Sequence, residues 1–519
     1  MTFGSMLRWL ARSLGSLLAA LLLVGAGWWL HFIWAGPELK PWHRAHLDAE
    51  FTARDYASGR VTSLAQYRAL ERQLLDQVQT EVLDRVEPAD RGPFNRFATG
   101  SRSDPAAWDT NWNLTFVLEP ACAPRGGVVL LHGLTDSPYS LRSLGEAFVR
   151  QGFRVVGLRL PGHGTAPAAM LDLEVEDMQA ATELAVRDLR ATLGPAAPIA
   201  LVGYSNGAAL AVSYALDALE RRDELPQPSQ LVLLSPAIGI SRLAAIGRIR
   251  TGLSDVPGFG RTAWQSIEPE LDPFKYQSFS FRAAGVTQRL TRTITRRIAR
   301  AAQAGSLGGF PPTLAFVSTV DATVHADAVA YALLQPLGEG ERELVLFDVN
   351  RLAVAQPLLV DDPGPLTRRL VEERSRSYRL TLVTNVSPDT LAVVERRYDA
   401  HATQAVERSL EVQWPRNVFS LSHVALPFPP DDPLYGYDAP RTQRHVQLGR
   451  IEVRGETGVL EVPSWMLTRQ RSNPFHGYLL ERASAALERA LGDAGTAAVP
   501  VDRCTAASAA AGAPTEPAP

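Results

Sequence analysis

The chain has 519 residues, of which 46% are hydrophobic and 21% charged, as is typical of a globular protein with a large core. Its length suggests roughly two to four domains. The formal net charge of −3 gives no indication of a nucleic-acid partner. Two cysteines, Cys122 and Cys504, are too few for a disulfide framework or a cysteine-rich metal site. They either form one bridge in an oxidising compartment or remain free thiols.

The N-terminal segment predicts a membrane anchor. Residues 14–34 form a run of 21 whose only ionisable side chain is one histidine, which is long enough to cross a bilayer as a helix. The small residues 24–26 would also suit a signal peptidase, but the apolar run continues well beyond them. We therefore expect an uncleaved single-pass anchor at residues 1–36. Arg8 and Arg12 precede the run and favour a cytoplasmic N-terminus, with the rest of the protein on the other side.

Residues 37–110 predict a linker and a helical spacer. The linker is expected at 37–59 and a helix at 63–86, where Ser63 and Gln66 match a capping box. An apolar stripe follows at helical spacing: Tyr67, Leu70, Leu74, Val78, Val82 and Val86. We expect this stripe to pack against the main domain, with a dimer interface as the alternative.

From Trp112 onward, short apolar runs alternate with helical patterns. Strands are expected at 112–120, 126–133, 153–160, 198–205, 230–237, 311–321, 342–349 and 378–385, and helices at 140–150, 175–193, 206–219, 324–334 and 475–491. This alternation predicts an α/β domain over 111–492 with a doubly wound, mostly parallel sheet. Ligands bind such sheets beyond the carboxyl ends of the strands.

Two segments interrupt the alternation, and a third ends it. Residues 239–310 are expected to form a helical cap, in which apolar residues recur every four positions among the arginines of 286–300. That helix either packs on one face or acts as a lid on an anionic membrane surface. An insertion is expected within 337–415. Residues 493–519, rich in Ala, Pro, Gly and Thr, predict a flexible tail.

The sequence Gly203-Tyr204-Ser205-Asn206-Gly207 follows a predicted strand and begins a predicted helix. It is either a tight turn or a strained elbow that presents Ser205 as a nucleophile. An active serine needs a base, a carboxylate and donors for the oxyanion. The backbone N–H groups of Leu134 and Asn206 suit the donor role, because they follow one strand end and begin the helix after the serine.

In this strand arrangement the nucleophile should be followed along the chain by a carboxylate and then by a histidine. Asp321 follows the strand at 311–321 and is preferred to Asp327, although an aspartate at this point could also only cap a helix. His423 is preferred as the base because it combines the chain order with a strand-end setting. The other histidines considered lie on predicted helices, in polar stretches or before the elbow: His132, His163, His325, His401, His445 and His476. His132 is expected to be structural.

Five segments, LLHGLTDSP, RLPGHGTAP, LVGYSNGA, VSTVDATV and SLSHVALPF, occur in the order found in the α/β-hydrolase superfamily. The chain most resembles its serine esterases related to monoacylglycerol lipases and lysophospholipases. The resemblance implies Ser205, Asp321 and His423 as the catalytic residues, with Leu134 and Asn206 as oxyanion donors.

Two departures from these relatives stand out. The aspartate and the histidine are 102 residues apart, whereas relatives have a few tens of residues there, which points to the insertion. Asn206 stands where relatives commonly have methionine, and predicts a more polar pocket.

The sequence therefore predicts a membrane-anchored serine hydrolase that cleaves a carboxylic ester, of lipid-like character given its setting, without metal or organic cofactor. Thioester and amide substrates use the same residues and stay open. The rival hypothesis is a catalytically silent hydrolase-fold protein that binds a lipid or a partner. Substrate identity and oligomeric state are not indicated.

Overall fold

The computed structural model describes residues 3–35, 37–239, 260–353, 363–415, 418, 420–450 and 471–493. Within them, a ten-stranded sheet has the order β1-β3-β2-β4-β5-β8-β9-β10-β11-β12. The strands are β1 (Phe116–Leu118), β2 (Gly126–Leu131), β3 (Phe153–Leu158), β4 (Ile199–Tyr204), β5 (Gln230–Leu234), β8 (Thr313–Ser318), β9 (Arg342–Phe347), β10 (Arg379–Asn385), β11 (Ala392–Tyr398) and β12 (Val406–Gln413). Strands β3 to β10 in this order are parallel, and the edge strands are antiparallel to their neighbours.

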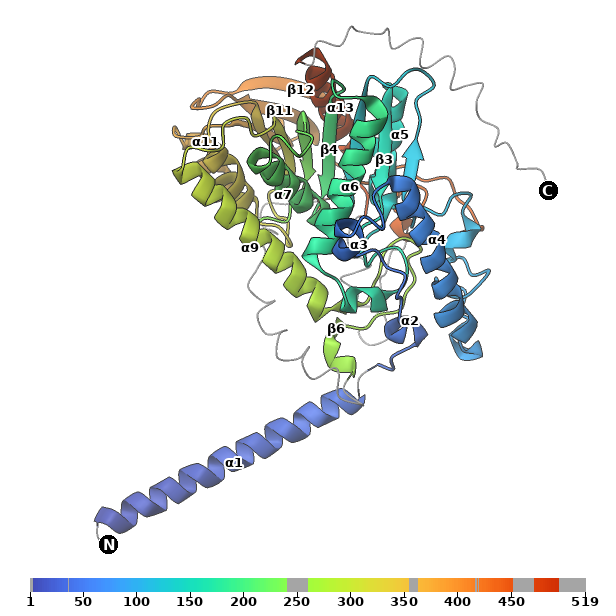
Figure 1. Ribbon diagram of the computed structural model, residues 1–519. Coiled ribbons are helices and arrows are strands. Elements are labelled where there is room, and N and C mark those ends of the chain that lie inside the picture. The colour runs from blue at the N-terminus through green and yellow to red at the C-terminus, as the bar shows by residue number, and fades with distance from the viewer. Residues whose placement is uncertain are drawn as a thin grey trace, which may run out of the picture.

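Helices cover both faces of the sheet (Figure 1). On one face, α5 (Arg142–Arg150) and α13 (His476–Asp493) pack on residues such as Leu130 of β2. On the other, α6 (Val175–Leu193), α7 (Asn206–Glu220) and α9 (Phe281–Gln303) pack on residues such as Leu131. Every residue of β2, β4, β5 and β8 is buried, because these strands are covered on both faces, and most of their residues are apolar. The predicted doubly wound α/β fold is confirmed.

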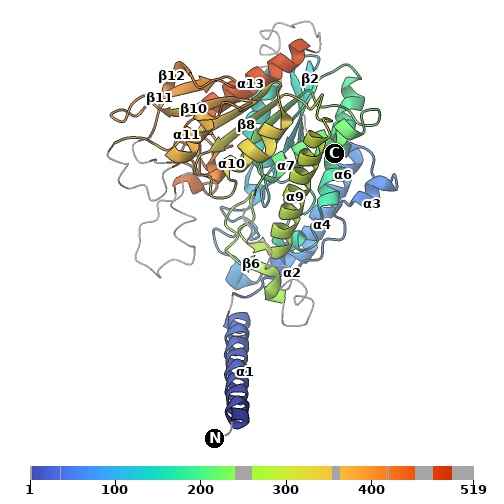
Figure 2. The same ribbon diagram turned by 90° about the vertical axis from the view of Figure 1, so that its left-hand side faces the viewer.

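The predicted insertion widens the sheet. Helix α11 (Gly364–Glu372) and strands β10, β11 and β12 all lie between Asp321 and His423 in the chain. They add a parallel strand and then an antiparallel hairpin to the edge formed by β9 (Figure 2). Strand β10 matches the prediction for 378–385, whereas β11 and β12 were not predicted.

Residues 37–110 pack closely on the hydrolase domain. Short helices α2 (Pro41–Arg44) and α3 (Ala53–Ala57) precede α4 (Leu64–Glu81), which begins at the predicted capping box. Tyr67, Leu74 and Val78 of the predicted apolar stripe are buried in α4, and Leu70 is partly buried. The helix ends at Glu81, before the predicted residue 86, and Val82 and Val86 are buried beyond its end. The prediction of a linker at 37–59 is wrong, because Trp42, His43 and Phe51 are buried there and the segment contributes to the core.

The cap is described only from Gly260 onward, since 240–259 lie outside the described residues. In α9, Val286, Leu290, Ile294 and Ile298 are each at most 1% exposed. These residues pack with α7 and the sheet in the main core. The helix therefore packs on one face, and its apolar side is not available to serve as a membrane lid.

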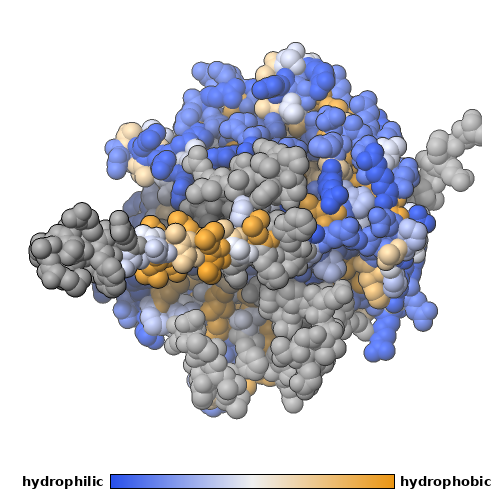
Figure 3. Space-filling view, turned by 90° about the horizontal axis from the view of Figure 1, so that it is seen from below, coloured by the Kyte–Doolittle hydropathy of each residue, from blue (hydrophilic) through white to orange (hydrophobic). Residues whose placement is uncertain are grey.

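Helix α1 (Phe3–Ala35) extends away from the domain (Figures 1 and 2). Its described surface carries exposed leucines, visible as an apolar stretch in Figure 3. Nevertheless, none of the helices in the described ranges has the length and apolarity required to cross a bilayer, so the predicted transmembrane anchor at 1–36 is not supported.

Cys122 is disulfide-bonded. Cys504 and the predicted tail, apart from Asp493 at the end of α13, lie outside the described residues.

Candidate active site

Ser205 lies on a sharp turn between strand β4 and helix α7. Its backbone φ is +52°, a left-handed value that is strained for a serine. Gly203 and Gly207 make the turn sterically feasible. A Cβ atom on Gly203 would overlap the backbone of Ala208, and one on Gly207 would overlap the carbonyl oxygen of Leu131. The two glycines are therefore explained by close backbone contacts, and the turn is the strained elbow rather than a simple tight turn.

The structure brings Ser205, His423 and Asp321 together from three distant parts of the chain. The Ser205 hydroxyl lies 3.0 Å from His423 Nε2, and His423 Nδ1 lies 2.7 Å from Asp321 Oδ2. The aspartate accepts the Nδ1–H, which leaves Nε2 free to accept the serine proton. All three are largely buried, with Ser205 9% exposed. The order serine, base and orienting carboxylate is the one that nucleophilic catalysis requires.

Asp321 is held as an anion. Burial acts to raise its pKa, but the charge and hydrogen bond of His423 outweigh burial and leave the pKa below its ordinary value of 3.8. Oδ1 also accepts hydrogen bonds from the backbone N–H groups of Thr323 and Val324, at 2.8 and 2.9 Å. The long insertion between Asp321 and His423 therefore does not separate them, since its strands extend the sheet edge and return the chain to the site.

The other candidates have different surroundings. Asp327 is exposed and accepts a hydrogen bond from the N–H of Ala328. His132 is fully buried, and its Nε2 accepts a hydrogen bond from the N–H of Leu160 at 3.0 Å. Burial lowers the pKa of His132 well below its ordinary value. The expectation that His132 is structural agrees with these contacts.

The two expected oxyanion donors lie beside the serine. Leu134 lines the same cavity as Ser205 and His423. Asn206 is the first residue of α7, where backbone N–H groups lack helical acceptors and favour negative charge. The Asn206 side chain is fully buried and its amide lies 3.5 Å from the sulfur of Met178. The expectation of a more polar pocket from Asn206 is therefore wrong, because this side chain faces the core.

The cavity over Ser205 has a volume of about 370 Å³ and combines apolar and charged walls. Ala237, Phe279, Ala284 and Val424 supply apolar surface. Lys275 Nζ lies 2.6 Å from Asp136 Oδ1, and both residues line the cavity. A second chamber of about 200 Å³ shares these two residues and continues toward Phe428, Tyr435 and Arg471. Sequence reasoning missed Lys275, because nothing in its local pattern marks it.

Comparison with known proteins agrees with this class of site. The model of the family described as serine aminopeptidase, S33, matches residues 122–332, which include Ser205 and Asp321 but not His423. A thermostable monoacylglycerol lipase from Bacillus sp. (strain H-257) is 26% identical over 253 residues, 47% of this chain and 91% of that lipase.

Solved structures of lipolytic enzymes are also similar. A metagenome-derived lipolytic enzyme is 22% identical, with 45% of this chain and 87% of the other covered and a TM-score of 0.35. The monoacylglycerol lipase of Paleococcus ferrophilus is 20% identical, with 45% and 88% covered and a TM-score of 0.34. At such low TM-scores these two similarities add nothing to the assignment.

The topology is that of the α/β-hydrolase fold. The family match over residues 122–332 and the similarity to a monoacylglycerol lipase support an enzyme of the serine hydrolase class, esterase- or lipase-like.

Proposed function

We propose that the protein hydrolyses carboxylic esters through an acyl-enzyme formed on Ser205. The observation that carries the proposal is the hydrogen-bonded series from Ser205 through His423 to Asp321. His423 takes the hydroxyl proton as Oγ bonds to the ester carbonyl carbon, and then gives that proton to the leaving alcohol. Water, deprotonated by His423, then attacks the acyl carbon, the bond between that carbon and Oγ breaks, and His423 returns the proton to Oγ as the acid is released.

The backbone donors stabilise the charge that develops on the carbonyl oxygen. In the proposed mechanism this oxygen accepts hydrogen bonds from the N–H groups of Leu134 and Asn206. Asp321 holds the imidazole in the tautomer that accepts from serine and stabilises its positive charge. Each of these steps uses groups of this chain alone, and none calls on a metal or an organic cofactor.

Fluorophosphonate labelling tests the proposal. The probe should modify Ser205, and the modification should be absent in Ser205→Ala and strongly reduced in His423→Ala. A folded wild-type protein that stays unlabelled would contradict the enzyme and favour the silent binding protein. Thioester and amide substrates should be assayed beside esters, because the same residues serve all three reactions.

We propose further that the substrate carries a polar or anionic group near the ester. Lys275 has three N–H donors, of which Asp136 accepts one, and its side chain is 24% exposed toward the cavity. A monoester of a dicarboxylic acid should therefore be cleaved better than the matched neutral ester. Lys275→Met should remove this preference, and an unchanged ratio of kcat/KM in that variant would contradict it. A lipid ester with a polar head, in keeping with the named relatives, satisfies the same requirement.

Location is a separate proposal. Disulfides such as the one at Cys122 persist in oxidising compartments, which favours a non-cytoplasmic domain. Leu17 and Leu21 of α1 are about 60% exposed, at 59% and 61%, and a membrane would cover them. Carbonate extraction of cells that express the chain decides the matter: recovery in the membrane pellet supports attachment, and release contradicts it.

A further inference from the structure

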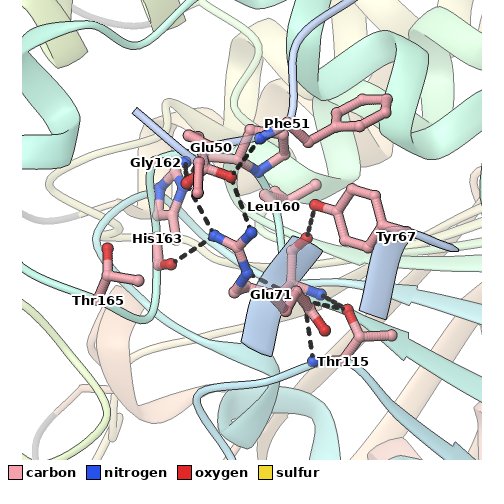
Figure 4. Close-up of polar contacts among 12 residues, drawn as sticks. Glu50, Phe51, Tyr67, Glu71, Thr115, Leu160, Gly162, His163 and Thr165 are labelled. Carbon is pink, nitrogen blue, oxygen red and sulfur yellow. Dashed lines mark hydrogen bonds and ion pairs between the residues drawn. The ribbon is translucent and has the colours of Figure 1, made fainter. Parts of the chain in front are cut away.

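Arg159, directly after β3, is held by two carboxylates from the segment that precedes the hydrolase core. It is 1% exposed. The carboxylate of Glu50 accepts hydrogen bonds from both terminal nitrogens of Arg159, at 2.9 and 2.8 Å. The carboxylate of Glu71 accepts one from Nε of Arg159, at 3.0 Å (Figure 4). Glu50 and Glu71 lie outside residues 122–332, the range matched by the family model, whereas Arg159 lies within it.

The charges of this cluster depend on one another. Burial opposes the positive charge of Arg159, but Glu50, with further contributions that include Glu71, holds the Arg159 pKa well above its ordinary value. Burial likewise acts to raise the pKa of Glu50, and the guanidinium outweighs it and lowers that pKa. Without Glu50, both terminal nitrogens of the buried guanidinium lose their carboxylate partner, and only Glu71, whose own pKa is raised by burial, remains to balance its charge. Such a loss is costlier than the loss of a surface pair.

The cluster fixes the conformation of the loop 159–165. Glu50 also accepts a hydrogen bond from the N–H of Gly162 at 2.9 Å, and Arg159 donates to the carbonyl of His163 at 3.0 Å. Tyr67 of α4 donates to the carbonyl of Arg159 at 2.7 Å. Side chains of the N-terminal segment therefore hold this loop at several points along its backbone (Figure 4).

The loop 159–165 in turn holds the segment 132–135, which carries Leu134. At one end, the N–H of Leu160 donates to His132 Nε2, so His132 must carry its proton on Nδ1 and donate it to the carbonyl of Gly133 at 2.8 Å. At the other end, Thr165 N–H donates to the hydroxyl of Tyr276 at 2.7 Å.

Tyr276 completes the connection to the oxyanion segment. Its N–H donates to the carbonyl of Thr135 at 2.9 Å. Thr135 has a φ of +66°, a left-handed conformation that a threonine keeps only when its surroundings impose it. One end of the segment around Leu134 is thus bonded directly to a loop whose shape depends on Arg159, and the other end is connected to the same loop through Tyr276.

We propose that Glu50 is a positioning residue: through Arg159 and the loop 159–165 it sets the position of the Leu134 N–H for the oxyanion. The residues before the hydrolase core then belong to the catalytic apparatus rather than acting as a spacer. This inference rests on the proposed ester hydrolysis. Its signature is a defect in stabilising the transition state, with substrate binding unchanged.

The test compares Glu50→Gln with a matched control. Glu488→Gln breaks another bidentate pair, in which Arg125 donates to Glu488 at 2.9 and 2.8 Å. Arg125 directly precedes β2, whereas the oxyanion segment follows the other end of this strand. Steady-state hydrolysis of p-nitrophenyl butyrate gives kcat and KM. The dissociation constant of a trifluoromethyl ketone, whose serine adduct carries an oxyanion, reports on the donors directly.

Glu50→Gln should lower kcat by about 10- to 100-fold, as expected for a catalytic group misplaced by about 1 Å, with KM unchanged within about twofold. The ketone should bind more weakly by the same factor, and Glu488→Gln should behave as wild type. A Glu50→Gln protein with kcat within about threefold of wild type, or with equal losses in the control, would overturn the proposal.

A milder variant guards against loss of folding. Tyr67→Phe keeps the ring and removes only the hydrogen bond to the Arg159 carbonyl, so it should show the same pattern at smaller size. Wild-type kinetics in Tyr67→Phe would overturn the proposal if Glu50→Gln does not fold.

Fluorophosphonate labelling separates the proposed ester hydrolysis from the inference about Glu50. An unlabelled wild type removes the proposed function and this inference together, whereas a labelled wild type with an unaffected Glu50→Gln removes only the inference.

Discussion

At the scale of single residues, Asp321 and Asp327 offer a matched comparison. Asp321 lies in the connection after β8 and Asp327 six positions later in the short helix α10 (Ala326–Ala328), yet the first is buried against His423 and the second is exposed. An asparagine at 321 keeps the shape but lacks the charge that favours the required imidazole tautomer. Asp321→Asn should lower kcat about 10⁴-fold, the size seen when a triad carboxylate is neutralised. Asp327→Asn should stay within about twofold of wild type, and the reverse pattern would reassign the orienting carboxylate.

The lowered pKa of Asp321 also has a consequence for stability. A carboxyl group whose pKa is lower in the folded protein stabilises the fold above the unfolded pKa, here 3.8, and this contribution is lost as the pH falls through the folded value. The difference in free energy of unfolding between wild type and Asp321→Asn should therefore shrink below about pH 4. Urea titrations at pH 7 and pH 3 measure it, and a difference independent of pH would contradict an ionised Asp321.

Residues could be predicted from the sequence where position along the chain determines position in space. Ser205 and Asp321 follow the parallel strands β4 and β8, whose carboxyl ends meet at one edge of the sheet. For His423 the chain order was a sufficient guide, but its predicted strand-end setting is wrong, because His423 begins a 3-10 turn (His423–Ala425) and the described residues just before it are not in a strand. Lys275 and Arg159 could not be predicted, because their partners Asp136 and Glu50 lie more than a hundred positions away without a shared pattern. Asn206 was misjudged for a related reason: the first residue of a helix points its N–H at the site, but its side chain direction depends on packing.

At the scale of elements, α9 has an apolar stripe that is buried in the core and a basic face that is exposed to solvent. The stripe is buried against α7, and Thr291 donates to the carbonyl of Ala237 at 2.6 Å, next to the catalytic cavity.

Among elements that the sequence did not predict, β12 has mostly exposed residues and β11 mixes buried and charged positions. Their weak alternation reflects an edge hairpin, whereas the central strands were predictable because burial on both faces makes them apolar.

Substitutions on the two faces of α9 should differ sharply. Ile294→Ala removes a fully buried side chain and should lower the free energy of unfolding by about 2–5 kcal/mol. Arg296→Gln, on the exposed face, should change it by less than about 0.5 kcal/mol. Chemical denaturation measures both. Replacing Arg292, Arg296 and Arg300 together by Gln should leave hydrolysis of esters in anionic vesicles unchanged, and a large loss would revive the hypothesis of a membrane-bound lid.

At the scale of the whole molecule, the N-terminal segment, the cavity wall and the hydrolase core meet around Glu270. The carbonyl of Glu270 accepts a hydrogen bond from the N–H of Arg96, and its carboxylate accepts from the N–H groups of Gln277 and Ser278. Ser278 also contacts His43, at 3.0 Å from its Nε2. Gln277 belongs to the wall of the second chamber. Parts of the chain that the sequence assigned to separate units therefore meet around one buried residue, Glu270.

Glu270 should make the stability of this junction depend on pH. Burial is the largest influence on it and raises its pKa from 4.5 to about 7, against the opposing charge of Arg96. A carboxyl group with a raised pKa binds more protons in the folded than in the unfolded state between these values. Its contribution to stability is therefore complete below about pH 4.5 and is lost as the pH rises to about 7, by up to about 3 kcal/mol.

The comparison of wild type with Glu270→Gln isolates this contribution, since the other titrating groups are common to both proteins. The free energy of unfolding of wild type relative to Glu270→Gln should fall between pH 4.5 and 7 and level off above it. Glu176→Gln, at an exposed position in the first turn of α6, should keep the wild-type dependence. Urea denaturation across this range measures all three proteins. A constant difference between wild type and Glu270→Gln would mean that the two backbone donors keep the carboxylate ionised, and that the junction holds a buried anion at every pH in the range.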